Sequence, residues 1–302
     1  MATSDPINEL LAHFREMEER RRGPIVPSVP PVDRVVLFVD MLGFAALTET
    51  YPIDVAMLNA HNRPFSSGFD TILSTPKNPL TEAFHGFHFA LRWAIDMANM
   101  RRPVTAITFS DSAFIAFEHL IDAASLAVDL ARSMLSQKIP IRIGIAFGSF
   151  AALRFRSDVT AEGGDHASEF LGTAVVRAYQ TERCGIKGLR IFLHPSAHSL
   201  LKDPIHNPDK HPASGHAIRL LECSVFERAN RVGVQYELDY WDPAPTKEAS
   251  AWRGLQEMWD KAPGFALEHY QATAEAVNRM RMGLGEAPLP SFRRRTLPRR
   301  KP

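Results

Sequence analysis

An apolar run that ends in a single carboxylate is the feature that most constrains how this chain can fold. Residues 35–39 are Val-Val-Leu-Phe-Val, Asp40 follows directly, and Gly43 comes shortly after it. A short run rich in β-branched residues indicates a buried strand, and the glycine behind it indicates a tight turn. The sequence therefore predicts a strand, a turn and then a helix. Because a carboxylate at the end of a buried strand needs a compensating partner, we expect Asp40 to have one.

A second acid occurs in a similar setting. Residues 107–117 are Ile-Thr-Phe-Ser-Asp-Ser-Ala-Phe-Ile-Ala-Phe, which predicts a hairpin over 104–117 with Asp111 in its turn. If the two acids lie close together, their oxygens suit a divalent cation such as Mg²⁺ or Mn²⁺. Asp40 is also explained as a helix N-cap and Asp111 as a turn residue. The cap explanation, however, leaves Asp111 unaccounted for.

The composition indicates a globular protein without a strong global charge. The chain has 302 residues, of which 45% are hydrophobic, and a formal net charge of +1, so no general attraction to nucleic acid or membrane is expected. No apolar run approaches the roughly 18 residues of a spanning helix, and the N-terminus lacks the pattern of a secretory signal. With only Cys184 and Cys223 present, we expect a reduced, cytoplasmic protein.

Patterning divides the chain into four regions. We expect an N-terminal helix and a proline-rich linker over 1–30, a central domain over 31–245, C-terminal helices over 246–287 and a basic, disordered tail over 288–302. Within the central domain, helices are predicted over 44–62, 80–99, 121–137 and 170–182. Strands are predicted over 140–148 and 149–155 with a glycine turn between them, and near 190–193, 217–222 and 231–240. A polar loop is predicted over 157–167. This order indicates an α+β fold with a mostly antiparallel central sheet flanked by helices.

Four segments together carry a resemblance. They are Phe-Val-Asp-Met-Leu-Gly-Phe at 38–44, Thr-Phe-Ser-Asp-Ser at 108–112, Ile-Arg-Ile-Gly-Ile-Ala-Phe-Gly at 141–148 and Leu-Gly-Thr-Ala-Val-Val-Arg-Ala-Tyr at 171–179. In this order they resemble the motifs of the class III nucleotidyl cyclases. The resemblance covers residues 34–195 and implies that family's ferredoxin-like catalytic domain.

The resemblance also implies a site. Asp40 and Asp111 match the family's catalytic metal carboxylates, and Met41 matches the residue whose main-chain carbonyl contacts the metal. Leu42, Gly43 and Phe44 match the turn whose N–H groups hold the triphosphate in the family. Phe38 matches the residue that opens the same motif. The family uses two divalent cations, which activate the attacking 3′-hydroxyl and neutralise the phosphates. A homodimer with shared active sites is implied, because the family builds each site from two subunits.

The departures from the family pattern concern the transition state and the base. The family's helix carries an Asn and an Arg that stabilise the transition state, where this chain has Val176 and Gln180; Arg177 or Arg183 is the candidate replacement. The position of a purine-selecting Lys or Glu holds the apolar Ile107, or the polar Thr105 if the register is shifted. Glu169 falls near the second base-selecting position. Ser110 replaces a hairpin glycine, and the long spacing between the two acids implies an insertion.

This combination resembles the bacterial pyrimidine cyclases of the Pycsar anti-phage systems, which make cyclic UMP or cyclic CMP for a separate effector to sense. Tyr51, Arg101 and Arg102 are candidates to contact a pyrimidine, and an Arg donor suits the carbonyl acceptors of uracil better than the amine of cytosine. The prediction is therefore a uridylate cyclase that converts UTP to 3′,5′-cyclic UMP and pyrophosphate in anti-phage defence, with no stable nucleic-acid or membrane partner.

Three alternatives stay open. The first is a cytidylate cyclase that makes cyclic CMP. The second is a catalytically silent cyclase-like domain that senses a nucleotide, which the missing Asn and Arg would explain. The third is another enzyme with a pair of aspartates on its sheet, such as a diguanylate cyclase or a polymerase-like nucleotidyltransferase. The absence of a Gly-Gly-Asp-Glu-Phe-like hairpin argues against the diguanylate cyclase.

Overall fold

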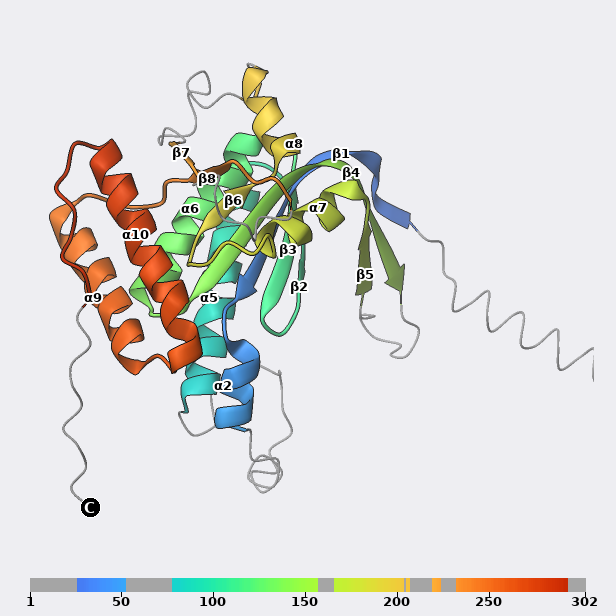
Figure 1. Ribbon diagram of the computed structural model, residues 1–302. Coiled ribbons are helices and arrows are strands. Elements are labelled where there is room, and N and C mark those ends of the chain that lie inside the picture. The colour runs from blue at the N-terminus through green and yellow to red at the C-terminus, as the bar shows by residue number, and fades with distance from the viewer. Residues whose placement is uncertain are drawn as a thin grey trace, which may run out of the picture.

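The computed structural model describes residues 26–52, 78–156, 166–203, 205–206, 219–223 and 232–292. Its centre is an eight-stranded sheet in the order β2-β3-β1-β4-β6-β8-β7, with β5 paired to β4 (Figure 1). The strands are β1 (Val26–Met41), β2 (Thr105–Thr108), β3 (Ser112–Phe117), β4 (Ile141–Arg156), β5 (His166–Leu171), β6 (Ile191–Leu193), β7 (Leu220–Glu222) and β8 (Tyr236–Leu238).

Apart from α2, which is shorter than predicted, the described helices lie close to the predicted positions. They are α2 (Phe44–Thr50), α5 (Pro79–Asn99), α6 (Leu120–Ser136), α7 (Thr173–Glu182), α8 (Pro195–His198), α9 (Pro245–Lys261) and α10 (Leu267–Gly283), with short 3-10 turns at Ser199–Lys202 and Gly264–Ala266. The long α5 begins at a capping box, in which the Asn78 side chain accepts from the Thr81 N–H at 2.9 Å. None of the described helices combines the length and hydrophobicity of a membrane-spanning segment.

The order of elements gives the topology directly. The chain runs from β1 through α5 to the β2–β3 hairpin, then through α6 to β4. In the sheet these strands lie in the order β2-β3-β1-β4, and all three of their pairings are antiparallel. That is the split β-α-β arrangement of a ferredoxin-like fold. The predicted α+β class is confirmed, and within the described residues only β4 and β6 pair in parallel.

Alternation along β1 sends side chains to the two faces of the sheet. Val35, Leu37 and Val39 are fully buried in the large core that the sheet forms with α5, α6, α9 and α10. Val36 and Phe38 point to the opposite face, where α7 covers the middle of the sheet (Figure 1). Asp40 continues the second series, so it emerges on the α7 face.

β1, β4 and β5 extend beyond the predicted strands, whereas β8 covers only Tyr236–Leu238 of the strand predicted over 231–240. β1 begins at Val26, so the part of the proline-rich segment from Val26 to Pro31 is strand rather than linker, and it pairs with the far half of β4. β4 is one strand that passes through Gly148 without a turn. The predicted polar loop overlaps β5, which begins at His166. In each case pairing with a neighbouring strand overrides a local turn signal.

The predicted tail is ordered at its beginning. Leu289 and Phe292 pack against the main core, and the Leu289 N–H donates to the Asn278 side chain at 2.7 Å. The prediction of disorder from residue 288 onwards is therefore wrong for 288–292. The helix predicted over 44–62 ends at Thr50, before Pro52. The expectations for residues 1–25, 53–77, 157–165 and 293–302 lie outside the described residues.

Candidate active site

The two predicted acids lie side by side at one end of the sheet. Asp40 is the penultimate residue of β1 and is paired with Ser112 on β3 and with Arg142 on β4. Asp111 is in the turn between β2 and β3, and its carbonyl oxygen accepts a hydrogen bond from the Met41 N–H at 2.8 Å. The last residues of β1 and the hairpin turn are thus joined through the main chain.

The chain leaves β1 through a tight turn. Gly43 has φ of 81°, in the left-handed region that glycine adopts at little cost, and α2 begins directly after it. The Leu42 N–H donates to the Pro140 carbonyl oxygen at 2.8 Å. Leu42 therefore does not offer its N–H to a phosphate. Across the described part of the chain, no main-chain acceptor is placed for the N–H groups of Gly43 and Phe44, as is normal at a helix start.

Negative charge accumulates around Asp40. Burial first, and then the nearby carboxylates of Glu182 and Asp111, raise the pKa of the Asp40 carboxyl to about 7. Arg142 and Arg183 oppose this shift, and the Arg142 guanidinium is paired with Glu182 at 2.5 Å. Glu182 is completely buried. A half-buried Asp40 beside two further acids is an environment that a cation would stabilise.

Arg183, the residue after α7, is an exposed cation near the acids. The Arg183 guanidinium lies 4.8 Å from the centre of the Tyr179 ring and its Nε lies 3.8 Å from Glu182. Its charge lowers the pKa of Asp40. Arg177, the other candidate on α7, donates instead to the Phe147 carbonyl oxygen at 2.9 Å. Phe147 is paired with Val35, at a distance along β1 from Asp40.

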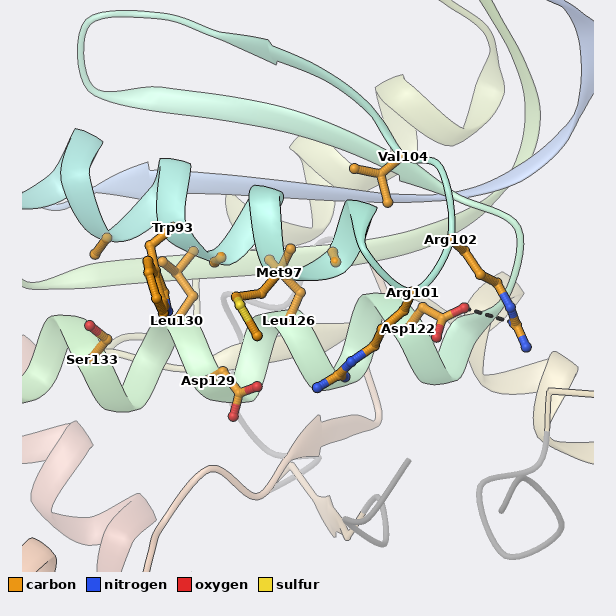
Figure 2. A pocket seen from close by; sticks show the side chains of 13 residues that line it. Trp93, Met97, Arg101, Arg102, Val104, Asp122, Leu126, Asp129, Leu130 and Ser133 are labelled. Carbon is orange, nitrogen blue, oxygen red and sulfur yellow. Dashed lines mark hydrogen bonds and ion pairs between the residues drawn. The ribbon is translucent and has the colours of Figure 1, made fainter. Parts of the chain in front are cut away.

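Arg101 and Arg102 are not brought to the acids. They follow α5 and line a groove between α5 and α6, where Arg102 pairs with Asp122 at 2.9 Å (Figure 2). The next strand begins at Thr105, which is level with Val36 through Ala116. The two arginines therefore lie toward the opposite end of β2 from Asp111.

The other predicted substrate contacts are scattered. Tyr51 is 40% exposed and follows the end of α2. Glu169 lies in β5, paired with Leu153 in the far half of β4. Phe38 is 4% exposed and packs against Phe114 and Tyr179, so it is a core side chain rather than an open contact surface. Phe44 is half-buried and packs toward α5.

The donors at the site suit a hard cation. No group of three or more His, Cys, Asp or Glu side chains in the described ranges is placed to hold a metal. Magnesium in nucleotide sites, however, is typically bound through one or two carboxylates together with substrate phosphates. Asp40 and Asp111 would supply such a pair of carboxylates, and the crowding of negative charge around Asp40 would favour a cation there.

Sequence reasoning missed three participants. Glu182 lies beside Asp40 although the two are distant in sequence, and Arg142 on β4 is the ion-pair partner of Glu182. His88 contacts the hairpin turn from α5. None of these contacts has a local sequence signal, because each depends on how separate elements meet.

Comparisons with known proteins give a limited result. No protein-family model and no curated protein matches the sequence. Among solved structures, guanylyl cyclase Cya2 is 12% identical, with 72% of this chain and 96% of that one covered and a TM-score of 0.43. Adenylyl cyclase CyaB from P. aeruginosa is 16% identical, with 71% and 98% covered and a TM-score of 0.44. The guanylate cyclase domain of RhGC from Catenaria anguillulae, in complex with GTP, is 15% identical, with 70% and 98% covered and a TM-score of 0.44. At these values the functional assignment has to rest on the residues of this chain.

Proposed function

We propose that the protein is a metal-dependent nucleotidyl cyclase of the class III type. The observation that carries the proposal is the placement of Asp40 and Asp111 next to each other, joined through the Met41 N–H, at one end of a ferredoxin-like sheet. The order of motifs along the sequence supports the same assignment. Asp40, Asp111 and the Met41 carbonyl would hold the cations, which when bound would neutralise phosphate charge and promote ionisation of the attacking hydroxyl.

The residues around the acids have separate roles in this proposal. The 3′-hydroxyl oxygen of the substrate forms a bond to the α-phosphorus while its proton passes to water, and the bond from that phosphorus to the pyrophosphate oxygen breaks. The turn after β1 presents the N–H groups of Gly43 and Phe44 to phosphate oxygens. Arg183, which is 61% exposed, is the cation proposed to bind the triphosphate. The Arg142–Glu182 pair fixes the end of α7 against β4 beside the acids.

Self-association belongs to the proposal. Four large apolar side chains remain exposed on the α7 side of the sheet and its hairpin, with exposures between 39% and 54%: Phe109, Leu171, Val176 and Tyr179. Exposed apolar side chains gathered on one side are typical of an interface. A second copy of the chain placed here would complete each site, and a two-fold arrangement would create two equivalent sites.

Within this class we propose UTP as the substrate, 3′,5′-cyclic UMP as the product, and an anti-phage signal to a separate effector as its use. The support is the apolar Ile107, half-buried on β2, at a position where purine cyclases of this type carry a polar selector. CTP and cyclic CMP are the runner-up. The placement of Arg101 and Arg102 gives the pyrimidine preference no further support.

The decisive experiment is incubation of the purified chain with Mn²⁺ and each of the four ribonucleoside triphosphates, with the products resolved by mass. A cyclic monophosphate that disappears in both Asp40→Ala and Asp111→Ala is the expected result, and UTP is expected to be the best substrate. Cyclic AMP or cyclic GMP would retain the cyclase and overturn the pyrimidine preference. Linear or two-base products would overturn the cyclase itself.

A second candidate is a silent nucleotide sensor of the same fold. Val176 and Gln180 stand where the related enzymes carry transition-state groups, and Val176 is 54% exposed with no polar atom to offer. Binding of a nucleotide and Mn²⁺ without pyrophosphate release, in a wild-type protein that is folded and dimeric, would favour the sensor over the enzyme.

A further inference from the structure

The turn that carries Asp111 is fixed at several points. The Phe109 N–H donates to the Ser112 carbonyl oxygen at 2.7 Å and closes the turn, and the Asp111 carbonyl accepts from Met41. A third contact comes from outside the sheet, where Nε2 of His88 lies 3.0 Å from the Ser110 carbonyl oxygen. A carbonyl oxygen can only accept, so the His88 ring nitrogen is the donor.

The His88 ring is itself held in place. It packs against Phe84 with ring centres 4.4 Å apart and meets the edge of Phe87 at 5.3 Å. Phe87 is completely buried in the main core, so this part of α5 is anchored to the sheet. The imidazole therefore presents its N–H to the turn from a rigid support.

The contact continues to the carboxylate. The Ser110 hydroxyl donates to Oδ1 of Asp111 at 3.0 Å. His88 thus holds the main chain of Ser110, and the Ser110 side chain orients the Asp111 carboxylate. We propose that His88 is a positioning residue for the cation site, acting through Ser110 to set where the Asp111 carboxylate lies. This inference rests on the proposed metal-dependent function.

The tether matters because a metal site tolerates little displacement of its ligands. Oxygen ligands must hold a cation within about 0.2 Å of the ideal distance. Phe109 and Ser110 are exposed at a hairpin tip, and such tips are the more mobile parts of a sheet. Without the tether, the turn would sample positions in which Asp111 no longer faces Asp40. Groups that orient metal ligands typically contribute about 10- to 100-fold to metal affinity.

The test is a direct titration of Mn²⁺ into the full chain, without nucleotide, by calorimetry or by loss of the free Mn²⁺ paramagnetic resonance signal. His88→Phe keeps the aromatic packing and removes the donor, and it is expected to raise the Mn²⁺ dissociation constant by about tenfold or more. His88→Gln places an amide N–H near the original Nε2 and is expected to bind almost as wild type. His85→Phe, on the same helix with its ring stacked on Phe89, is the matched control and is expected to bind as wild type.

The outcomes separate the two proposals. If wild type binds Mn²⁺, Asp111→Asn does not, and His88→Phe binds as wild type, the positioning role is overturned and the metal site stands. If wild type binds Mn²⁺ neither alone nor together with UTP, the metal-dependent function is overturned, and the role of His88 with it. If circular dichroism shows that His88→Phe does not fold, the Mn²⁺ affinities of His88→Gln and His88→Asn are compared instead. Both variants carry an amide, but the shorter Asn side chain does not reach Ser110. Equal affinity in that pair would overturn the inference.

Discussion

The N–H of Met41 and the carbonyl oxygen of Asp111 form a 2.8 Å hydrogen bond that ties the end of β1 to the tip of the β2–β3 hairpin. Asp40 directly precedes the donor, and Asp111 is itself the acceptor. This hydrogen bond therefore fixes the main chain at Asp111 relative to the main chain next to Asp40. The closeness of the two acids also contributes to the raised pKa of Asp40.

Metal affinity should fall as the pH drops below about 7. Burial first, then Glu182 and Asp111, raise the pKa of Asp40 from 3.8 to about 7 in the folded protein. A proton therefore competes with the cation for this carboxylate in the neutral range. Titration of Mn²⁺ at pH 6 and pH 8 should show clearly weaker binding at pH 6. A pH-independent affinity would contradict the raised pKa.

The same shift predicts how the metal-free protein responds to pH. Because the folded-state pKa is higher than the unfolded value of 3.8, the folded state binds the proton more tightly, and this group's contribution to stability falls as the pH rises from about 4 to about 7. Asp40→Asn removes that loss, so its unfolding temperature should exceed that of wild type at pH 8 and approach it at pH 4. Thermal unfolding in the presence of a chelator measures both. An equal gain at both pH values would point to a cause other than Asp40 ionisation.

The local pattern predicted most of the elements, but not the full lengths of β1 and β4 or the contacts between elements. The apolar run at 35–39, the helix over 121–137 and the order of motifs predicted the α+β sheet and placed Asp40 and Asp111 together. The extension of β1 back to Val26 was missed because prolines indicate a linker, whereas pairing with β4 holds this segment extended. Glu182 beside Asp40 and His88 at the Asp111 turn have no local signal, since tertiary packing alone brings them there.

Breaking the Arg142–Glu182 pair should destabilise the protein asymmetrically. Arg142 is 12% exposed and Glu182 is completely buried, with Nε and Oε1 2.6 Å apart. Arg142→Met leaves a buried carboxylate without its partner and should lower the free energy of unfolding by about 3 kcal/mol or more. Glu182→Gln keeps a hydrogen-bond acceptor for the guanidinium and should cost less. Urea unfolding of both variants and of the double mutant would test this, and a larger loss in Glu182→Gln would contradict it.

The contact between α7 and β4 depends on Gly144. A methyl group there would lie 2.3 Å from the Ala178 carbonyl oxygen and 2.5 Å from the Glu182 nitrogen, both main-chain atoms that have no freedom to rotate away. Gly144→Ala should therefore shift α7 and lower the free energy of unfolding by about 1–3 kcal/mol. Gly264→Ala, where a methyl group meets nothing within 4 Å, is the control. Urea unfolding should separate the two variants, and equal stabilities would contradict the close approach of α7 to the sheet.

The ordered beginning of the C-terminal segment gives the last prediction. The Phe292 ring lies 4.6 Å from the Trp252 ring and 5.7 Å from the Trp259 ring, both on α9. Phe292→Ala removes this half-buried ring and should lower the free energy of unfolding by about 1–2 kcal/mol, less than for a fully buried phenylalanine. Tryptophan fluorescence should shift to longer wavelength as the two indoles become more hydrated. Ser291→Ala, at the exposed neighbouring position, should change neither quantity. Unchanged fluorescence in Phe292→Ala would mean that the segment does not pack on α9 in solution.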